Sequence, residues 1–240
     1  MLKIKVEGKE LKGIIEKALC NMDKKAAMPL LTKIIISDDG NQLTAYTSDL
    51  EGYLQVNTSN YSSIETGSVG IDEEDLKVLL KMNNEVVITE QEDSILVQNG
   101  KKNISLMKYD ISNFPKMPED IFIDALQFAE NDFAETINNL VTFTSDNESN
   151  EIMGCFNFNI TDNRVETLDG HRIGMKTIKD SEKICDSGSV LVKNIIVSDL
   201  KKTLDKKSTN KIVLSHSSKY VKVTGNNFTY IQRKVEGEYY

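Results

Sequence analysis

Three residue types that can perform acid–base or anion chemistry meet in one short segment. "VETLDGHRIGMKT", residues 165–177, contains Asp169, His171 and Arg172 within four positions. The chain has only two histidines and three arginines, so this grouping stands out from the rest of the sequence. An imidazole beside a carboxylate can act as a general base, and a guanidinium can bind an anion or a partner. The segment is therefore a candidate either for catalysis or for binding.

The catalytic interpretation lacks the partners that it needs. A nucleophile–base pair would require a serine or cysteine held near His171, and the sequence contains no nucleophile elbow of the form G-x-S-x-G. The second histidine, His216, lies in "LSHSS" without the spacing of zinc ligands. We expect no catalytic residue, no metal and no cofactor, and we keep a hydrolase using Asp169 and His171 as the alternative function.

Two further observations limit the chemistry of the segment. Asp169-Gly170 is a favourable turn pair, and Arg172 could simply form an ion pair with Asp169 in a structural role. The cysteines are widely spaced and form no C-x-x-C motif, which predicts neither a zinc ribbon nor a disulfide scaffold; they are Cys20, Cys155 and Cys185.

Composition and charge indicate a folded protein with an acidic surface. Hydrophobic residues make up 39% of the 240 residues and charged residues 28%, and the net charge is −8. This balance excludes a generally basic nucleic-acid binder but not a local basic surface, because solvent screens charges beyond about 8 Å. The start, "MLKIKVEGKE", alternates apolar and charged residues, so it predicts a strand and not a signal peptide. We expect a cytoplasmic protein.

The sequence contains an internal repeat of two similar halves. A proline-containing connector, "NFPKMPED" at residues 113–120, lies at its midpoint, and the two halves place similar segments in the same order at an offset of 120 to 125 residues. Each half begins with a strand and an amphipathic helix, continues with alternating strands, repeats "GSV" and ends with a second helix and further strands. Asp49 falls opposite Asp169. We expect an α+β fold with two tandem domains, 1–117 and 118–240, each with two helices packed on antiparallel sheets.

The first helix of each half is predicted from apolar residues that recur at helical spacing. In the first half they are Leu11, Ile14, Ile15, Ala18 and Leu19, and in the second half they are Phe133, Ile137, Leu140 and Val141. The second helices are expected at "DEEDLKVLLKM", residues 72–82, with Leu76, Leu79 and Leu80 on the packed face, and near residues 195–207. The core residues expected in the latter are Ile196, Val197, Leu200 and Leu204.

The order of these segments resembles the bacterial replicative sliding clamp, the beta subunit of DNA polymerase III. "MPLLTKIII" and "YTSDLEGYLQV" are similar to the Pro-Ile-Leu and Thr-Asp-Leu-Glu segments of that family, and "NFPKMP" is similar to its Phe-Pro-x-x-Pro linker. "TLDGHRIG" is similar to the Thr-Asp-Gly-His/Tyr-Arg-Leu segment, and "KVEGEYY" to the entry to domain three. The resemblance covers all 240 residues but only two of the three domains of the family.

The resemblance implies a DNA-clamp fold and a role as a non-catalytic processivity factor. Six similar domains would form a ring that encircles duplex DNA and tethers the replicative polymerase, the clamp loader and other clients that carry a clamp-binding motif. The ring would be a dimer if a third domain exists, or a homotrimer if the chain is a complete two-domain clamp. A hydrolase and a scaffold that does not bind DNA are the remaining alternatives.

Lysines opposite the packed faces of the helices are the expected DNA contacts. In an acidic protein, a shared surface of lysines would bind phosphates without reading base sequence. Residues expected to contact DNA are Lys12, Lys24, Lys25, Lys77, Lys81, Lys201 and Lys202. The resemblance places basic DNA-facing residues of the family at Lys25, Lys81 and Lys202. It also places basic residues of the family near Glu74 and Asp75, so the acidic stretch 72–75 departs from the family pattern.

The resemblance also assigns a binding role to the segment that contains His171. In the family this segment forms one wall of the pocket that receives a hydrophobic–aromatic peptide of the clients. The matching residues are Ile152, Leu168, Gly170, His171, Arg172 and Ile173, and Leu168 stands where the family has threonine. Ile104 and Leu106 match an apolar edge contact between subunits. We therefore expect this segment to bind a client peptide through buried apolar groups.

Overall fold

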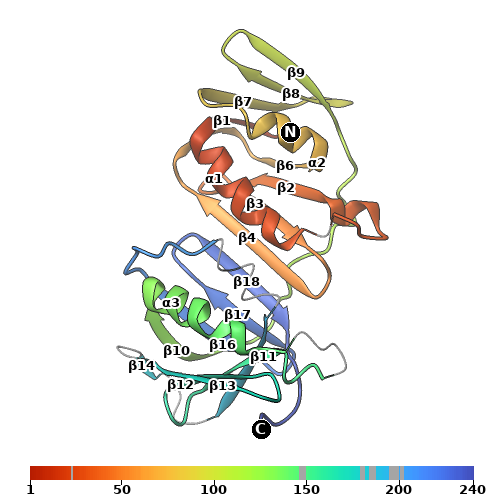
Figure 1. The fold of residues 1–240 in the computed structure, drawn as a ribbon. Coiled ribbons are helices and arrows are strands. Elements are labelled where there is room, and N and C mark those ends of the chain that lie inside the picture. The colour runs from red at the N-terminus through yellow and green to blue at the C-terminus, as the bar shows by residue number, and fades with distance from the viewer. Residues whose placement is uncertain (23, 146–149, 179–181, 184–187, 195–199, 201–202) are drawn as a thin grey trace. The chain divides into compact units, whose positions relative to one another are not determined.

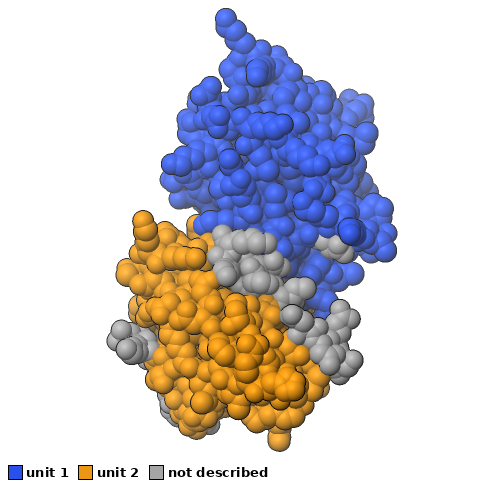
Figure 2. Space-filling view, viewed as in Figure 1, with its two compact units in different colours: residues 1–117 blue, residues 118–240 orange. Residues whose placement is uncertain are grey.

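A computed structural model describes the chain except residue 23 and residues 146–149, 179–181, 184–187, 195–199 and 201–202. The described residues form two compact units, Met1–Met117 and Pro118–Tyr240, which Figure 2 distinguishes by colour. Each unit consists of two antiparallel sheets, and its first helix packs against their strands (Figure 1).

Unit 1 contains two sheets and two helices. The first sheet has the order β5 (Tyr61–Glu65), β1 (Lys3–Glu7), β7 (Glu85–Glu90), β8 (Ser94–Asn99) and β9 (Lys102–Met107). In the second sheet, neighbouring strands follow the order β4 (Gly52–Thr58), β3 (Leu43–Ser48), β2 (Lys33–Asp38) and β6 (Gly67–Asp72). The helices are α1 (Gly8–Ala18) and α2 (Glu73–Leu79), with 3-10 turns η1 (Leu19–Asn21) and η2 (Pro29–Thr32).

Unit 2 repeats this arrangement strand for strand. In one sheet, neighbouring strands follow the order β14 (Glu182–Lys183), β10 (Ile123–Ala129), β16 (Lys211–His216), β17 (Tyr220–Thr224) and β18 (Phe228–Arg233). The other sheet has the order β13 (Ile173–Thr177), β12 (Arg164–Leu168), β11 (Cys155–Asn159) and β15 (Ser189–Lys193). Helix α3 (Glu130–Leu140) continues into the 3-10 turn η3 (Val141–Phe143). The expected α+β fold of two similar repeats on antiparallel sheets is confirmed.

The first helices of the two units form because one apolar stripe of each is buried. α1 buries Leu11, Ile14, Ile15 and Ala18, and α3 buries Phe133, Ile137 and Leu140. The predicted stripes each extend one residue too far, since Leu19 and Val141 begin the 3-10 turns and are only half-buried. Tighter winding in a 3-10 turn shifts the side-chain direction and takes these residues off the stripe.

The second helices differ in how much of them the structure describes. α2 buries Leu76 and Leu79, while the expected core residue Leu80 is half-buried at the C-cap. Asp72 begins the helix by accepting a hydrogen bond from the amide of Glu74 at 3.0 Å. Most of the helix expected near 195–207, including Ile196 and Val197, lies outside the described residues. Leu200 and Leu204 are buried as expected.

The repetition extends to individual hydrogen bonds. The Thr47 hydroxyl donates to the carbonyl of Ala18 at 2.7 Å, and the Thr167 hydroxyl donates to the carbonyl of Leu140 at 3.2 Å. Each bond joins the buried face of a strand to the last residue of the first helix, where carbonyl groups lack a helical partner. Both hydroxyls are fully buried.

We expect Thr47→Val to destabilise unit 1 by about 1–3 kcal/mol, because it leaves the Ala18 carbonyl without its buried donor. Chemical denaturation followed by circular dichroism measures the change. Thr44→Val on the same strand is the matched control, because Thr44 is half-buried and its neighbour positions Leu43 and Ala45 carry the core face. Equal effects of the two substitutions would contradict a specific role for the Thr47 hydroxyl.

Candidate functional site

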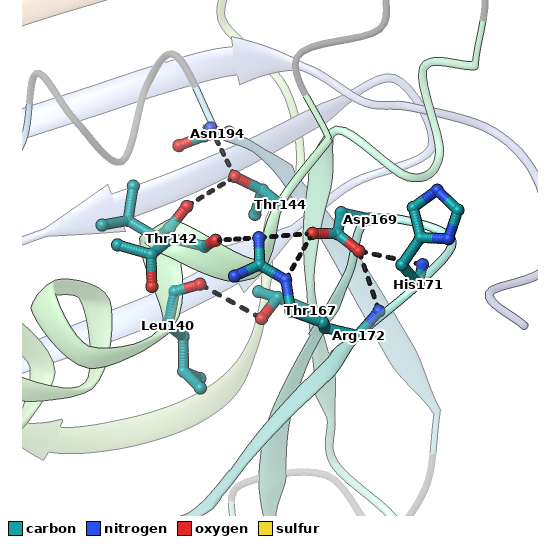
Figure 3. Close-up of polar contacts among 9 residues, drawn as sticks. Leu140, Thr142, Thr144, Thr167, Asp169, His171, Arg172 and Asn194 are labelled. Atoms are coloured by element: carbon teal, nitrogen blue, oxygen red, sulfur yellow. Dashed lines mark hydrogen bonds and ion pairs between the residues drawn. The ribbon is translucent and has the colours of Figure 1, made fainter.

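A tight turn between β12 and β13 holds the Asp-Gly-His-Arg segment. Oδ1 of Asp169 accepts hydrogen bonds from the amides of His171 at 2.9 Å and Arg172 at 2.8 Å (Figure 3). Gly170 adopts a left-handed backbone with φ of 88°, which glycine tolerates without strain. The residue types of the segment are therefore dictated first by the turn that it forms.

Unit 1 contains the same turn between β3 and β4. Oδ1 of Asp49 accepts hydrogen bonds from the amides of Glu51 at 3.1 Å and Gly52 at 2.6 Å. Leu50 occupies the left-handed position, with φ of 77°. The expected alignment of Asp49 with Asp169 thus corresponds to the same side-chain contact in both units, and only unit 2 adds a histidine and an arginine to it.

Arg172 fixes this turn to the end of the preceding helix. Its guanidinium donates to Oδ2 of Asp169 from Nε at 2.9 Å and from Nη2 at 2.7 Å, and Nη2 also donates to the carbonyl of Thr142 at 3.3 Å. The guanidinium carbon lies 5.5 Å from the centre of the Phe143 ring. Arg172 is still largely exposed, so the same side chain can position the turn and face a partner.

These contacts hold the carboxylate of Asp169 in its charged form. Backbone hydrogen bonds, first from His171, and the hydrogen bond from the Arg172 side chain lower the pKa of Asp169 to about 2. Because this pKa lies below that of an aspartate in an unfolded chain, about 4, the ionised group stabilises the folded turn above that pH. The contribution is lost as the pH falls toward the folded value.

The structure does not assemble a dyad of Asp169 and His171. Both carboxylate oxygens contact the backbone and Arg172, whereas His171 contributes only its amide (Figure 3). Within the described part of the chain, the imidazole of His171 has no hydrogen-bond partner and the residue is exposed. The described residues also contain no group of three or more His, Cys, Asp or Glu placed to hold a metal ion.

The residues expected to bind a client peptide divide into an exposed and a buried group. Gly170, His171 and Ile173 are exposed, and Ile173 exposes 66% of its surface at the start of β13. Leu168 is buried at the end of β12, directly before the turn, and therefore offers little surface to a peptide. Ile152 is partly buried and packs against the cluster of Cys155, Leu191 and Val235.

Three neighbours of this site were not predicted. Met175 exposes 63% of its surface and follows Ile173 on the same face of β13, because alternate residues of a strand share a face. Met153 places its sulfur 3.9 Å from the position that a Cβ on Gly170 would take. Phe143 lies under Arg172. The alternation of Ile173 and Met175 is the one signal in the sequence that could have identified any of them.

The expected DNA-contacting lysines that the structure describes all lie in unit 1. Lys77 and Lys81 are exposed on and just after α2, and within the described residues neither forms an ion pair. Lys24 forms an ion pair with Glu73, with 2.6 Å between Nζ and Oε1, and Lys12 forms one with Glu16 at 3.7 Å. Lys25 is exposed. The two remaining positions, Lys201 and Lys202, lie outside the described residues.

The expected subunit contact lies on β9, the last strand of its sheet. The side chain of Leu106 is buried at 4% exposure and packs inside unit 1, and Ile104 is half-buried. An apolar contact through the Leu106 side chain is therefore not available at the surface, because alternation turns Leu106 inward. Met107, at 64% exposure, is the apolar residue of this strand that faces outward.

The sequence matches two family models in succession. The model described as DNA polymerase III beta subunit, N-terminal domain, matches residues 2–118, and the model of the central domain matches residues 127–240. No helix in the described part of the chain is long and apolar enough to span a membrane.

Curated relatives and solved structures agree with this match. The chain is 23% identical over 231 residues to a beta sliding clamp of Staphylococcus epidermidis, covering 90% of the chain and 60% of the relative. It is 21% identical over 175 residues to that of Haemophilus influenzae, covering 71% and 48%. The chain thus spans about half to three fifths of these relatives.

The fold matches solved structures over the whole chain. A putative DNA polymerase III beta subunit from Eubacterium rectale has a TM-score of 0.90 at 20% identity, covering 100% of this chain and 67% of that one. The DNA polymerase sliding clamp from Bacillus subtilis has a TM-score of 0.89 at 18% identity, covering 100% and 66%. With both repeats matched in order by sequence and by fold, the chain belongs to the DNA polymerase III beta subunit family.

Proposed function

We propose that the chain acts as a DNA sliding clamp, contributing two domains to a ring that encircles duplex DNA and tethers a replicative polymerase. The observation that carries the proposal is the succession of two domains of one family, together with a fold match that covers 100% of the chain at a TM-score of 0.90. We place the boundary between the two proposed domains between Met117 and Pro118, where the two compact units also divide. The partners would be duplex DNA, the polymerase, the clamp loader and other clients, and the site of action the cytoplasm.

Self-association into a ring is part of this proposal. β9 is the last strand of its sheet, and the described residues pair with it only through β8. An open edge of this kind can pair with a strand of another copy through backbone hydrogen bonds. This contact would use the β9 backbone and Met107 in place of the Leu106 side chain. A dimer of longer chains and a trimer of two-domain chains would both supply six domains.

Lysines on the helices of unit 1 support sequence-independent binding to DNA. The alignment of α1 with α3 places Lys9 opposite Asn131 and Lys17 opposite Asn139, so the basic residues of this helix occur in one repeat only. Lys77 and Lys81 add two charges one helical turn apart. Lysine binds phosphate as a point charge without selecting a base, which suits a protein that moves along DNA.

The turn at Asp169 supports client binding in preference to catalysis. A carboxylate with a pKa near 2 is a weak general base at neutral pH, and it already contacts the backbone and Arg172. Ile173 and Met175 offer exposed apolar surface beside His171 and a cationic guanidinium. This combination suits an apolar peptide held by buried contacts with one charged residue at the rim. We therefore propose a non-enzymatic role without a cofactor.

We expect Lys77→Glu/Lys81→Glu to lower the affinity for a short labelled DNA duplex at least about tenfold, because two phosphate contacts are replaced by repulsion. The slope of log affinity against log salt between about 50 and 200 mM should fall by about 1 to 2. Fluorescence anisotropy measures both quantities.

The matched control is Lys101→Glu/Lys102→Glu, which makes the same change in net charge on the exposed β8–β9 hairpin. We expect this variant to bind DNA nearly as the parent does. An equal loss in both variants would attribute binding to net charge and would contradict a DNA surface on α2.

We expect Ile173→Glu to weaken binding of a labelled hydrophobic–aromatic peptide at least about tenfold, because burial of an isoleucine side chain contributes about 1.5–3 kcal/mol. His171→Ala should weaken peptide binding as well. We expect the parent protein to have no enzymatic turnover that this substitution could remove. Ile64→Glu is the control, since Ile64 is 52% exposed on β5 of unit 1 and has no proposed role. Unchanged peptide binding in Ile173→Glu would refute the client site.

A further inference from the structure

One acidic side chain compensates a lysine of the proposed DNA surface. Nζ of Lys24, in the segment between η1 and η2, lies 2.6 Å from Oε1 of Glu73, the first residue of α2. The two residues are 49 positions apart in the sequence, so the contact connects the segment after α1 to the second helix. The Lys24 side chain is 55% exposed, and that of Glu73 is 28% exposed. More than half of the Lys24 side-chain surface is thus open to solvent even with the ion pair formed.

Helix α2 explains why an acid occupies this position. Its first turn contains Glu73, Glu74 and Asp75, and negative charge in a first turn is stabilised by the helix dipole. Asp72 caps the helix and also binds the ammonium group of Lys33, which lies 4.2 Å from the centre of the Tyr109 ring. Both oxygens of the Asp72 carboxylate thus accept hydrogen bonds, Oδ1 from the amide of Glu74 and Oδ2 from Lys33. Glu73 is the acid that contacts Lys24.

Glu74 differs from Glu73 in its surroundings but not in its chemistry. It is exposed, and within the described residues its carboxylate forms no ion pair. Both glutamates carry one negative charge beside the same helix N-terminus, so their general repulsion of DNA is similar. Only Glu73 also neutralises a specific lysine.

We propose that Glu73 is an internal competitor for the phosphate that Lys24 would bind, and that it thereby sets the strength of the DNA contact at α2. This inference rests on the proposed function, because it specifies how tightly one part of the DNA surface binds. A phosphate that approaches Lys24 displaces a carboxylate already in contact, so the exchange releases fewer counterions than binding to an uncompensated lysine.

A similar compensation occurs on α1 and suggests its physical use. Lys12 forms an ion pair with Glu16 one turn later, at 3.7 Å. In the free protein a carboxylate pairs with such a lysine, and in the complex a phosphate does. Because the lysine has a partner in both states, the free energy of the protein–DNA complex changes little when a phosphate leaves it. Contacts of this kind hold a duplex near the protein while allowing it to move from one register to the next.

A double-mutant cycle on DNA binding tests the proposal. Glu73→Gln, Lys24→Gln and the double variant are compared with the parent by anisotropy with a labelled duplex between about 50 and 200 mM salt. Glutamine preserves the length and the helix propensity of glutamate, and circular dichroism verifies that α2 remains folded. We expect Glu73→Gln to raise affinity about three- to tenfold at the lowest salt and to steepen the salt slope by about 0.9.

The control variants separate the specific effect from general electrostatics. We expect Glu74→Gln to raise affinity less than twofold, and we expect the gain from Glu73→Gln to disappear in the Lys24→Gln background. A gain that persists without Lys24, or an equal gain in Glu74→Gln, would overturn the competitor role while leaving DNA binding intact. Absence of salt-dependent DNA binding by the parent would instead refute the proposed function, and the inference with it.

Discussion

Each repeat depends on burying one apolar helix face against antiparallel strands. The buried stripes of α1 and α3 end at Ala18 and Leu140, and in both cases a threonine hydroxyl from the neighbouring sheet binds the final carbonyl. The buried stripe fixes the rotation of the helix about its own axis, and the threonine bond holds the C-terminal end of the helix against the sheet. The polar residues that face solvent, and hence the charges available to a partner, follow from that rotation.

A shared scaffold carries different chemistry in the two units. The aspartate turn is closed by the same two amide contacts in both, but its second position is Leu50 in one unit and Gly170 in the other. The fourth position is Gly52 in unit 1 and Arg172 in unit 2. Because the turn itself does not need an arginine, the guanidinium and the exposed apolar residues after it are additions specific to unit 2.

Much of the fold follows from the sequence because its signals are local or repeated. Helical spacing identified the buried faces of α1 and α3, and the parallel order of segments identified the duplication. The candidate site was harder to predict in detail. Inward alternation of Leu106 depends on strand register, and the contacts of Lys24 with Glu73 and of Arg172 with Phe143 depend on tertiary packing. No spacing rule connects residues 49 positions apart.

The segments that follow the last strands of the two units fold back onto their own unit. Phe114 meets the ring of Tyr46 edge-on at 5.5 Å, and the hydroxyl of Tyr46 donates to the carbonyl of Pro115. Tyr239 packs against the cluster that contains Cys155. In each repeat, the exit segment thus contributes an aromatic side chain that packs on residues of the same unit. Duplication of such a unit therefore copies the exit segment together with the residues on which it packs, so that each new copy brings this contact with it.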